Sequence, residues 1–202
     1  MGAVKEENKN QLYPVFLKLD QLNTLLVGAG NVGLEKLQSL LNNSPHAKIT
    51  IVAPVVRDEV RNFIAGYSSV EIIERVFEIS DLENKHLAIL ATDDPVLHRQ
   101  VKLLASQKGI LVNVADTPDL CDFYLGSIVQ KGSLKIAIST NGKSPTIAKR
   151  IKEVFNEMLP EEIDLILDNM QVIRDRLKGD FQYKIKQLNE LTSSLVAENK
   201  NS

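Results

Sequence analysis

The stretch TLLVGAGNVGLEKLQSLL, residues 24–41, runs a short apolar segment through three glycines into residues with helical periodicity. This order predicts a strand, a tight turn and a helix whose first free N–H groups face an anion. Gly28 permits the turn, Gly30 lets a pyrophosphate approach the backbone, and Gly33 lets the helix pack closely on the strand. The pattern therefore indicates a dinucleotide-binding turn, with a glycine-rich turn that binds nothing as the alternative.

Short apolar segments alternate with helical stretches through the first half of the chain. This alternation predicts an α/β fold in which a Rossmann-like parallel sheet carries helices on both faces. Residues 13–19 come first and alternate in polarity, so we expect them to add an edge strand. The five buried strands that we expect are residues 24–27, 49–53, 70–76, 87–91 and 110–115.

The pattern changes after residue 116. The segment DFYLGSIVQKGSLKIAIST predicts two strands around a turn at residues 131–133, which is a β-hairpin. Ser144 and Pro145 then predict the N-cap and the first residue of an amphipathic helix. Pro160 is expected to end or bend that helix.

Two more amphipathic helices are expected in the C-terminal third, one ending at Gly179 and one running from about residue 181 to 196. Consecutive helices after a hairpin are typical of a separate, smaller domain. We therefore predict a dinucleotide-binding, Rossmann-like domain at residues 1–116, a hairpin where two chains pair at residues 117–143, and a small helical domain at residues 144–202. The polar segments 1–11 and 198–202 are expected to be mobile ends.

The composition excludes several classes of protein. The 202 residues carry a net charge of −2, which argues against a general nucleic-acid binder. Neither end resembles a signal peptide and no apolar run approaches the length of a membrane helix, so we expect a cytoplasmic protein. The single cysteine, Cys121, excludes internal disulfides and multi-cysteine zinc sites. The three histidines lack ligand spacing, so no metal site is predicted, and His98 is expected to be one side chain on a helix.

Residues 127–152 contain cations and no Asp or Glu. A solubilising face explains such a run, and so does a basic rim that attracts a polyanionic ligand. The stretch by itself does not decide between the two. The cations are Lys131, Lys135, Lys143, Lys149, Arg150 and Lys152.

In a doubly wound sheet the ligand lies across the carboxyl ends of the strands. At the first strand this edge holds Asn31 and Val32 of the glycine turn, and at the second strand it holds Pro54 and Val55. The second strand ends without the acidic residue that normally holds the adenosine ribose, so these residues do not distinguish NAD from NADP. Arg57 suits a 2′-phosphate or, more simply, is an exposed charge on the next helix.

Two further strand ends carry candidate residues. Thr92 closes a strand beside the crevice and is expected to contact the nicotinamide ribose or ring. Asp94 and Pro95 have the pattern of an N-cap and a first helical residue. Asp116 follows the last parallel strand, where a carboxylate can accept a substrate proton while hydride leaves for the nicotinamide. An Asx-type turn before Pro118 is the structural alternative for Asp116, and position alone leaves both open.

Four motifs in this order resemble the precorrin-2 dehydrogenase/sirohydrochlorin ferrochelatase family, the front module of siroheme synthase. The motifs are YPVFLKLDQLNTLLVGAGNVGLEKLQSLL, ATDDPVLHRQV, NVADTPDLCDFYLGSIVQKGSLKIAISTNGKSP and AKRIKEVFNEMLP. The resemblance covers about residues 13–177. It implies a standalone form, without the methyltransferase module of the fused enzymes.

The resemblance implies NAD-dependent oxidation of precorrin-2 to sirohydrochlorin, followed in many members by Fe²⁺ insertion. It also implies a homodimer that exchanges the hairpin and helical region, with the tetrapyrrole between the domains. The family's catalytic aspartate falls on Asp116. Its NAD contacts fall on Asn31, Val32, Pro54 and Val55, and around Thr92.

The resemblance gives the basic stretch a reason to exist, because precorrin-2 is a polycarboxylate. Lys143 and Lys149 are therefore predicted to bind substrate, together with Thr140. Thr140 aligns with a serine that some members phosphorylate, and here the hydroxyl is kept while the residue differs. The alternative function is a non-enzymatic NAD(H)-sensing module, which needs neither a carboxylate at the crevice nor a basic pocket.

Overall fold

The computed structural model describes residues 10–192 and divides the chain into two compact units. The first unit holds the chain up to Ser127 together with Ser139–Pro145, and the second holds Ile128–Ile138 and the chain from Thr146. The functional division predicted at residues 116 and 143 stays a prediction. The predicted mobile ends and the predicted end of the last helix at residue 196 fall wholly or partly outside the described residues.

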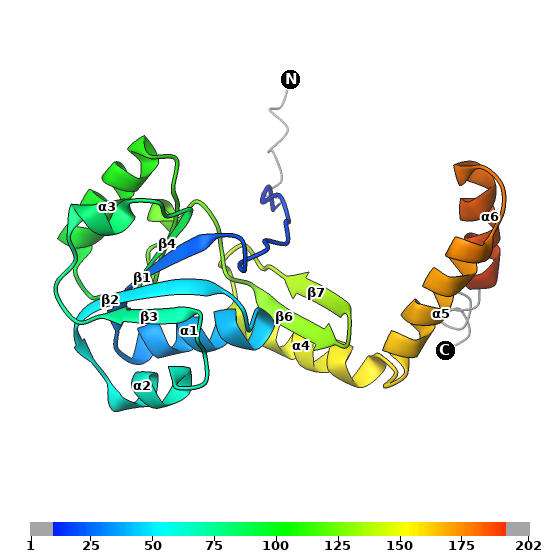
Figure 1. Cartoon of the computed structure of the whole chain (residues 1–202), viewed down its shortest axis with the longest axis horizontal. Helices are drawn as coiled ribbons and strands as arrows, with labels where there is room; N and C mark the ends of the chain where they lie inside the picture. Colours follow the sequence, from blue (N-terminus) through cyan, green and yellow to red (C-terminus); the bar gives the residue numbers. More distant parts are fainter. Residues whose placement is uncertain (1–9, 193–202) are drawn as a thin grey trace, which may run out of the picture. The chain divides into compact units, whose positions relative to one another are not determined.

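The first unit is built on a five-stranded parallel sheet with the strand order β3-β2-β1-β4-β5 (Figure 1). The chain adds β2 and β3 on one side of β1 and then crosses over to add β4 and β5 on the other side. The place between β1 and β4 is therefore the topological switch point, where doubly wound sheets bind their ligands. The strands are β1 (Asn23–Ala29), β2 (Lys48–Val56), β3 (Val70–Ile73), β4 (Leu87–Leu90) and β5 (Leu111–Val114). The predicted α/β fold with a Rossmann-like sheet is confirmed.

Helices cover both faces of this sheet (Figure 1). The helices α1 (Asn31–Asn43) and α2 (Asp58–Ile64) pack on one face, and α3 (Pro95–Gln107) packs on the other. Leu26 and Leu25, neighbours on β1, face opposite layers and are both fully buried. Because both faces are covered, the central strands are apolar on both sides, at residues 25–27 of β1 and 87–90 of β4.

The edge strand expected at residues 13–19 is wrong. These residues form no strand, and Tyr13, Val15 and Phe16 are exposed. Alternating polarity shows only that a segment suits a half-buried strand, whereas pairing needs a free edge. The segment reaches the sheet at the start of β2, where Lys48 N donates to Leu19 O at 3.1 Å, and β2 is already paired with β1 and β3.

The third strand is shorter than the sequence predicts, because β3 ends at Ile73 and not at residue 76. Arg75 leaves the sheet and binds Asp81 through two hydrogen bonds of 2.7 and 2.8 Å. Asp81 lies in a 3₁₀ turn, η1 (Ile79–Leu82), and accepts a further bond from the Glu78 backbone N–H. The bond from Arg75 is the main cause that lowers the pKa of Asp81.

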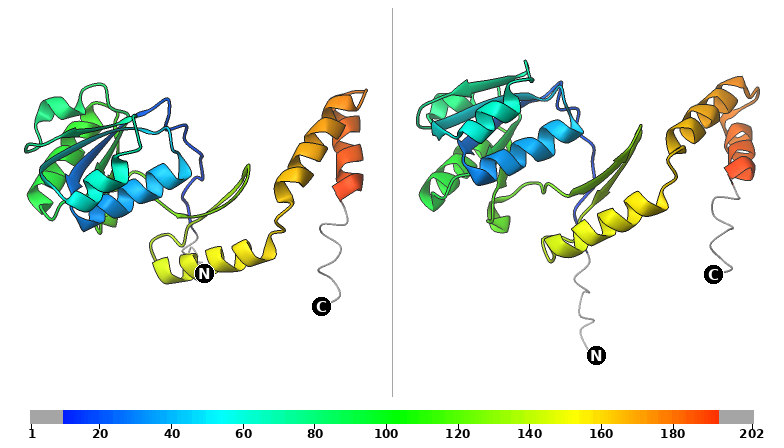
Figure 2. Two further views of the ribbon diagram at one scale, coloured as in Figure 1. Left: turned by 60° about the horizontal axis from the view of Figure 1, so that its bottom comes forward. Right: turned by 90° about the horizontal axis from the view of Figure 1, so that it is seen from below.

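The second half of the chain contains the predicted hairpin and helices (Figures 1 and 2). Pro145 begins α4, as the sequence predicts, and α5 and α6 run side by side (Figure 2). The elements are η2 (Pro118–Leu120), β6 (Ser127–Lys131), β7 (Leu134–Ile138), α4 (Pro145–Met158), α5 (Ile163–Arg176) and α6 (Phe181–Thr192). Within residues 10–192 every helix is too short or too polar to cross a bilayer.

The hairpin turn is tied to the start of α5 within the second unit. Lys131 Nζ donates 2.6 Å bonds to the Leu159 carbonyl and to Glu161 Oε1, and Ser133 N donates to Asp164 Oδ1 at 2.7 Å. A Cβ at Gly132 would meet the Asp164 carboxylate, so only glycine fits there. Lys131, a member of the basic stretch, is therefore engaged by the protein itself.

Candidate functional site

Backbone hydrogen bonds bring three strand ends together at the carboxyl edge of the sheet. Ala91 N, just after β4, donates to Val27 O of β1 at 2.8 Å. Ala115 N, just after β5, donates to Leu90 O of β4 at 2.9 Å. The glycine turn, Thr92 and Asp116 follow these positions directly, so the candidate residues on β1, β4 and β5 leave the sheet along one edge.

The three glycines of the turn serve different purposes. Gly28 has a φ of +103°, and a Cβ there would lie 2.5 Å from the Ala91 carbonyl oxygen. A Cβ on Gly33 would lie 2.4 Å from the Gly28 carbonyl oxygen. Gly30 differs, because nothing lies within 4 Å of its Cβ position. Gly28 and Gly33 are thus required by packing, whereas Gly30 leaves open space beside the backbone.

The start of α1 fits an anionic group. Gly30 is the N-cap and supplies no side-chain hydrogen bond, and the first turn holds no acidic residue. The first N–H groups of the helix, at Asn31 and Val32, therefore have no side-chain acceptor within the described residues. Free N–H groups and the positive end of the helix dipole favour a phosphate at this place.

Pro54 and Val55 lie inside β2 and not after it, which corrects the expected strand end. Val27 pairs with Val52, but Ala29 pairs with Val56, so residues 53–55 form an irregularity opposite Gly28. Pro54 has no N–H to give to a ladder, and Val55 is 73% exposed. The irregularity leaves both side chains on the surface beside the glycine turn.

Arg57 connects the end of β2 to the glycine turn, a contact that the sequence did not suggest. Its guanidinium donates to Asn31 Oδ1 and, at 2.7 and 3.1 Å, to the two carboxylate oxygens of Glu59. The bond from Arg57 is the main cause that lowers the pKa of Glu59 to about 2. The basic residue at this edge is thus matched by a carboxylate.

Thr92 is held by a buried histidine. Thr92 Oγ1 lies 2.9 Å from His98 Nε2, and His98 is 4% exposed. Burial lowers the pKa of His98, so the ring is kept neutral. The methyl carbon of Thr92, Cγ2, lies 3.0 Å from the position that a Cβ would take at Gly28. The predicted cap of the same helix is confirmed, because Asp94 accepts from Val96 N and Leu97 N.

Asp116 is an exposed residue with a φ of +55°, in the left-handed region. Its carboxylate makes no hydrogen bond or ion pair with any described residue. In an Asx turn the side chain accepts from the N–H two residues on, but that residue is Pro118, which has none. The carboxylate is therefore not used by the turn that carries it.

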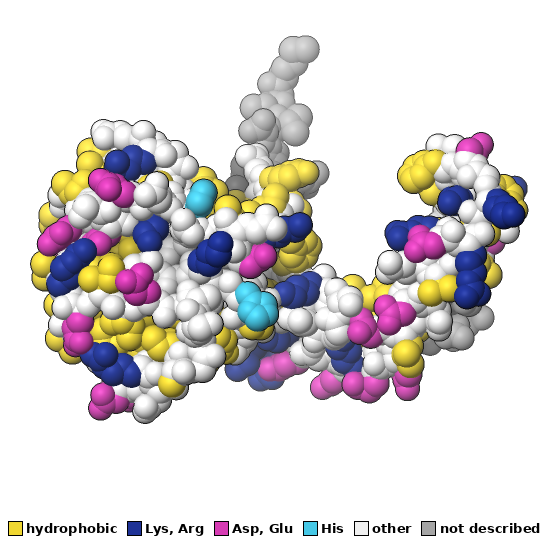
Figure 3. Space-filling view, viewed as in Figure 1, with side chains coloured by type: hydrophobic (Ala, Val, Ile, Leu, Met, Phe, Trp, Pro, Cys, Tyr) yellow, Lys and Arg dark blue, Asp and Glu magenta, His cyan; other side chains and the backbone are white. Residues whose placement is uncertain are grey.

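The residues predicted to bind substrate lie in both units. Thr140 Oγ1 donates to Ser144 O at 3.1 Å and accepts from Ser144 N at 3.2 Å, so its hydroxyl already orders its own loop. Lys143 is exposed in the same loop of the first unit, and Lys149 is exposed on α4 in the second. Arg150 pairs with Glu153 at 2.6 Å. Figure 3 shows charges of both signs interspersed over the visible face.

Among residues 10–192, no group of three or more His, Cys, Asp or Glu side chains gathers as it would around a metal ion. The three described histidines instead have separate surroundings. His86 Nδ1 accepts from Asn23 N at 3.0 Å, which is a structural bond between strands. His46 is exposed, and His98 holds Thr92.

Two family models match consecutive parts of the chain. Residues 15–127 match the model described as "Putative NAD(P)-binding", which covers the sheet and the whole candidate edge. Residues 131–155 match the model described as "Sirohaem biosynthesis protein central", which covers most of the hairpin and α4. The two matches follow the change from sheet to hairpin and helices.

Curated relatives of similar sequence are longer proteins. The siroheme synthase of Pseudoalteromonas atlantica is 35% identical over 171 residues, which is 85% of this chain and 36% of the relative. The siroheme synthase of Vesicomyosocius okutanii is 34% identical over 188 residues, 92% of this chain and 40% of the relative. The chain thus spans well under half the length of these relatives.

A solved structure matches almost the whole chain. SirC, a precorrin-2 dehydrogenase, has 29% sequence identity and a TM-score of 0.70, and the match covers 89% of each chain. The likeness therefore shows the fold over most of the chain.

Proposed function

The chain belongs to the family formed by the siroheme synthase N-terminal module and SirC precorrin-2 dehydrogenase, and we propose that it oxidises precorrin-2 to sirohydrochlorin in siroheme biosynthesis. The observation that carries the proposal is the exposed Asp116 carboxylate. It is unpaired among the described residues and follows β5 at the edge shared with Thr92 and the glycine turn.

The residues at this edge fit a dinucleotide, and we propose NAD. The open space at Gly30 and the free N–H groups of Asn31 and Val32 would hold the pyrophosphate. Pro54 and Val55, exposed beside the turn, would contact the adenosine half. Thr92, held by His98, would contact the nicotinamide half.

Oxidation of precorrin-2 removes two electrons and two protons, which leave as one hydride and one proton. NAD⁺, when bound, supplies the hydride acceptor. The Asp116 carboxylate accepts the proton, because it has no other hydrogen bond to give up and is open to solvent, to which it can pass the proton on. Products are sirohydrochlorin, NADH and H⁺, so charge and atoms balance.

The substrate is a polycarboxylate, and exposed cations would bind its acidic arms. Lys143 and Lys149 are the proposed contacts, and neither forms an ion pair with a described residue. Thr140 would act through its loop, since its hydroxyl is already bonded to Ser144. Lys131 is excluded from this role by its bonds to Leu159 and Glu161.

We also propose a homodimer. The helices α4 and α5 carry large apolar side chains that stay exposed in the single chain, among them Val154, Met158 and Leu165. Such faces are typical of helices that bury them against another protein surface. A second copy of this chain is the simplest partner, with the hairpin and helices exchanged as the family resemblance implies.

The decisive assay mixes the protein anaerobically with precorrin-2 and NAD⁺ and follows the absorbance of both products. We expect Asp116→Asn to lower kcat at least 100-fold while the Kd for NAD⁺ changes less than twofold, since one general base contributes roughly 10²–10⁴. Asp119→Asn is the matched control, because it removes a nearby exposed carboxylate. A parental rate in Asp116→Asn contradicts the assigned role.

The same assay separates the remaining alternatives. Addition of Fe²⁺ after oxidation tests insertion of the metal as a second substrate, for which Asp116 would accept pyrrole protons. NAD(H) binding without oxidation of precorrin-2 would favour the sensing module instead. Oxidation that stops at sirohydrochlorin would assign the chain the dehydrogenase reaction alone.

A further inference from the structure

β5 is an edge strand of the sheet, so the backbone groups on its outer side have no neighbouring strand of the described chain to pair with. Leu111 N and Ala115 N point toward β4, so the N–H and C=O groups of Val112 and Val114 point outward. Val112 is fully buried and Val114 is 3% exposed. Water therefore cannot satisfy these groups, and a buried backbone group without a partner is costly.

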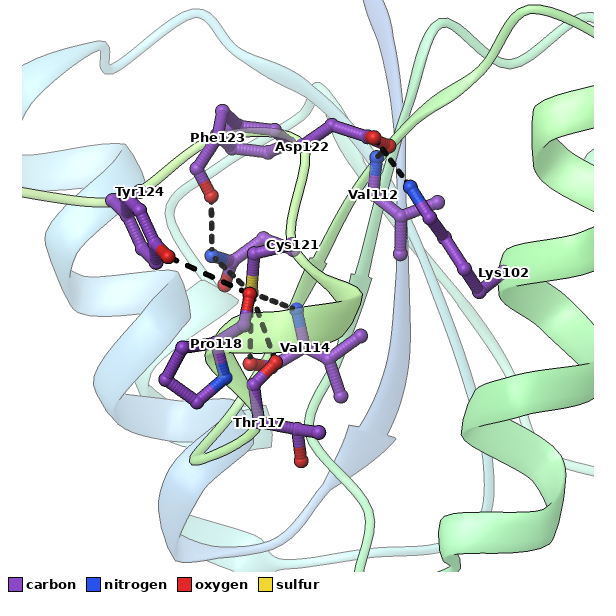
Figure 4. A network of polar contacts seen from close by, with 10 residues as sticks. Lys102, Val112, Val114, Thr117, Pro118, Cys121, Asp122, Phe123 and Tyr124 are labelled. Atoms are coloured by element: carbon purple, nitrogen blue, oxygen red, sulfur yellow. Dashed lines mark hydrogen bonds and ion pairs between the residues drawn. The ribbon is translucent and has the colours of Figure 1, made fainter. Parts of the chain in front are cut away.

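The chain returns along this edge and supplies the partners, as Figure 4 shows. Val112 N donates to Asp122 Oδ2 at 2.9 Å, and Asp122 N donates to Val112 O at 2.7 Å. Val114 N donates to Cys121 Sγ at 3.2 Å, and the thiol donates to Val114 O at 3.3 Å. The side chains of Cys121 and Asp122, together with the backbone N–H of Asp122, thus take the place of a further strand.

A third side chain completes the arrangement. Asn113 is 6% exposed, and its Nδ2 donates to Phe123 O at 2.8 Å, one residue beyond Asp122. Lys102 of α3 pairs with Asp122, so the carboxylate is fully engaged. We call Asn113, Cys121 and Asp122 the edge clamp.

One member of the edge clamp, Cys121, contacts the turn that carries Asp116. Cys121 Sγ contacts Val114, two residues before Asp116, and also Thr117 O, one residue after it, at 3.5 Å. Asp116 itself has a φ of +55°, a left-handed conformation that Asp adopts more readily than most residues but that still costs free energy. Its side chain contributes no bond to the turn, which is closed by the backbone bond from Thr117 N to Val114 O at 3.4 Å. Cys121 Sγ contacts Val114 O and Thr117 O, so it holds both ends of this turn.

We propose that the edge clamp positions the Asp116 carboxylate at the edge of the sheet, with Cys121 as the central positioning residue. This inference rests on the proposed role of Asp116 as the base. A thiol suits the task because one sulfur both accepts from Val114 N and donates to a carbonyl. Burial raises the pKa of Cys121, which keeps the proton that the second bond needs.

The first test measures kcat and KM of Cys121→Ala and Cys121→Ser. We expect Cys121→Ala to lower kcat at least tenfold, with the KM for NAD⁺ within twofold of the parent value. The kcat of Cys121→Ser should be at least three times that of Cys121→Ala, because a hydroxyl both donates and accepts hydrogen bonds. In the Asp116→Asn background, Cys121→Ala should cause no further loss, because both changes act through one group. Val101→Ala, a truncation in the same core, should leave kcat within twofold.

Additive losses in the double variant, or an equal loss of kcat in Val101→Ala, would overturn the proposal. A second readout does not depend on turnover. Amide hydrogen exchange at Thr117, whose N–H donates to Val114 O, should be at least ten times faster in Cys121→Ala than in Val101→Ala, and equal rates would also overturn the proposal. If the parent protein fails to oxidise precorrin-2, the proposed function is wrong, while the exchange rates still decide whether the edge clamp orders the turn.

Discussion

The sheet unit and the C-terminal helices differ in where their apolar side chains lie. All of the largest fully buried side chains of the described residues fall between Leu25 and Val112. In α4, α5 and α6 only Ala148 is buried, whereas Val154 is 51%, Met158 64% and Phe181 74% exposed. The sheet unit therefore has a complete core of its own, and the helices present apolar surface that still needs a partner.

This difference matches a division of labour. The edge that would bind NAD depends on backbone segments that approach each other closely. A close-packed core keeps such segments in place. The helices carry apolar side chains that the rest of the described chain leaves largely exposed, as expected of a surface that associates with another protein. The predictions below test this contrast, beginning with the change of largest expected effect.

Gly33→Ala should destabilise the sheet unit by about 2–3 kcal/mol, the usual cost of overpacking. The added Cβ would lie 2.4 Å from Gly28 O, so α1 must move away from β1. Urea unfolding measures the loss. Gly30→Ala is the matched control, since its Cβ meets nothing within 4 Å, and it should cost less than about 1 kcal/mol.

The same pair of variants separates packing from binding. Gly30→Ala is expected to weaken NAD⁺ binding about tenfold, or about 1.4 kcal/mol, by filling the space beside the backbone. Titration of NAD⁺ measures the Kd. Full NAD⁺ affinity in Gly30→Ala would mean that the dinucleotide does not approach the turn there.

Val154→Asp should raise the dimer dissociation constant at least tenfold, about 1.4 kcal/mol, because it places a charge on the exposed apolar side of α4. Analytical ultracentrifugation over a concentration series measures the constant. Asn156→Asp, which adds the same charge elsewhere on α4, is the control. A parent chain that stays monomeric at high micromolar concentration would contradict the proposed homodimer.

The sheet was predictable from the sequence because its signals are local. The apolar runs of the strands, the glycine turn, and the cap formed by Asp94 and Pro95 each depend on a few neighbouring residues. Residues 13–19 were predicted wrongly because strand pairing depends on which edges the finished sheet leaves open. Local pattern carries no information about that.

The places of the candidate residues along the sheet edge were predictable, and their contacts were not. The rule that ligands lie at carboxyl strand ends pointed to Thr92 and Asp116. The bond between Thr92 and His98 was missed because it depends on how α3 lies beside β4. The contacts of Cys121 with Val114 were missed for the same reason, since the sequence does not show that β5 is an edge strand.

His98 should make the stability of the sheet unit depend on pH. Burial lowers its pKa in the folded state, so its contribution is complete above the unfolded value of about 6.5 and is lost as pH falls through the folded value. Asp93 and Asp94 oppose this shift and Arg99 adds to it. Urea unfolding from pH 7.5 to 5 measures the loss of stability.

The variants for this measurement are His98→Gln and His46→Gln. His98→Gln should remove that part of the pH dependence, while the exposed His46→Gln should keep it. His98→Gln should also raise the Kd for NAD⁺ a few-fold, because Thr92 loses its partner. A parental pH profile in His98→Gln would show that the buried ring does not control the loss.

Lys143→Gln and Lys149→Gln should have the smallest effects, a three- to fivefold lower kcat/KM for precorrin-2, or about 0.6–1 kcal/mol each. The cations are exposed, so each interacts with a substrate carboxylate through water and salt, and the loss should shrink as ionic strength rises. Steady-state rates at low and high salt measure it, with the exposed Lys108→Gln as control. Lys143 belongs to the sheet unit and Lys149 to the helices. Equal losses would mean that both units handle the substrate, whereas a loss confined to Lys143 would leave the helices with association alone.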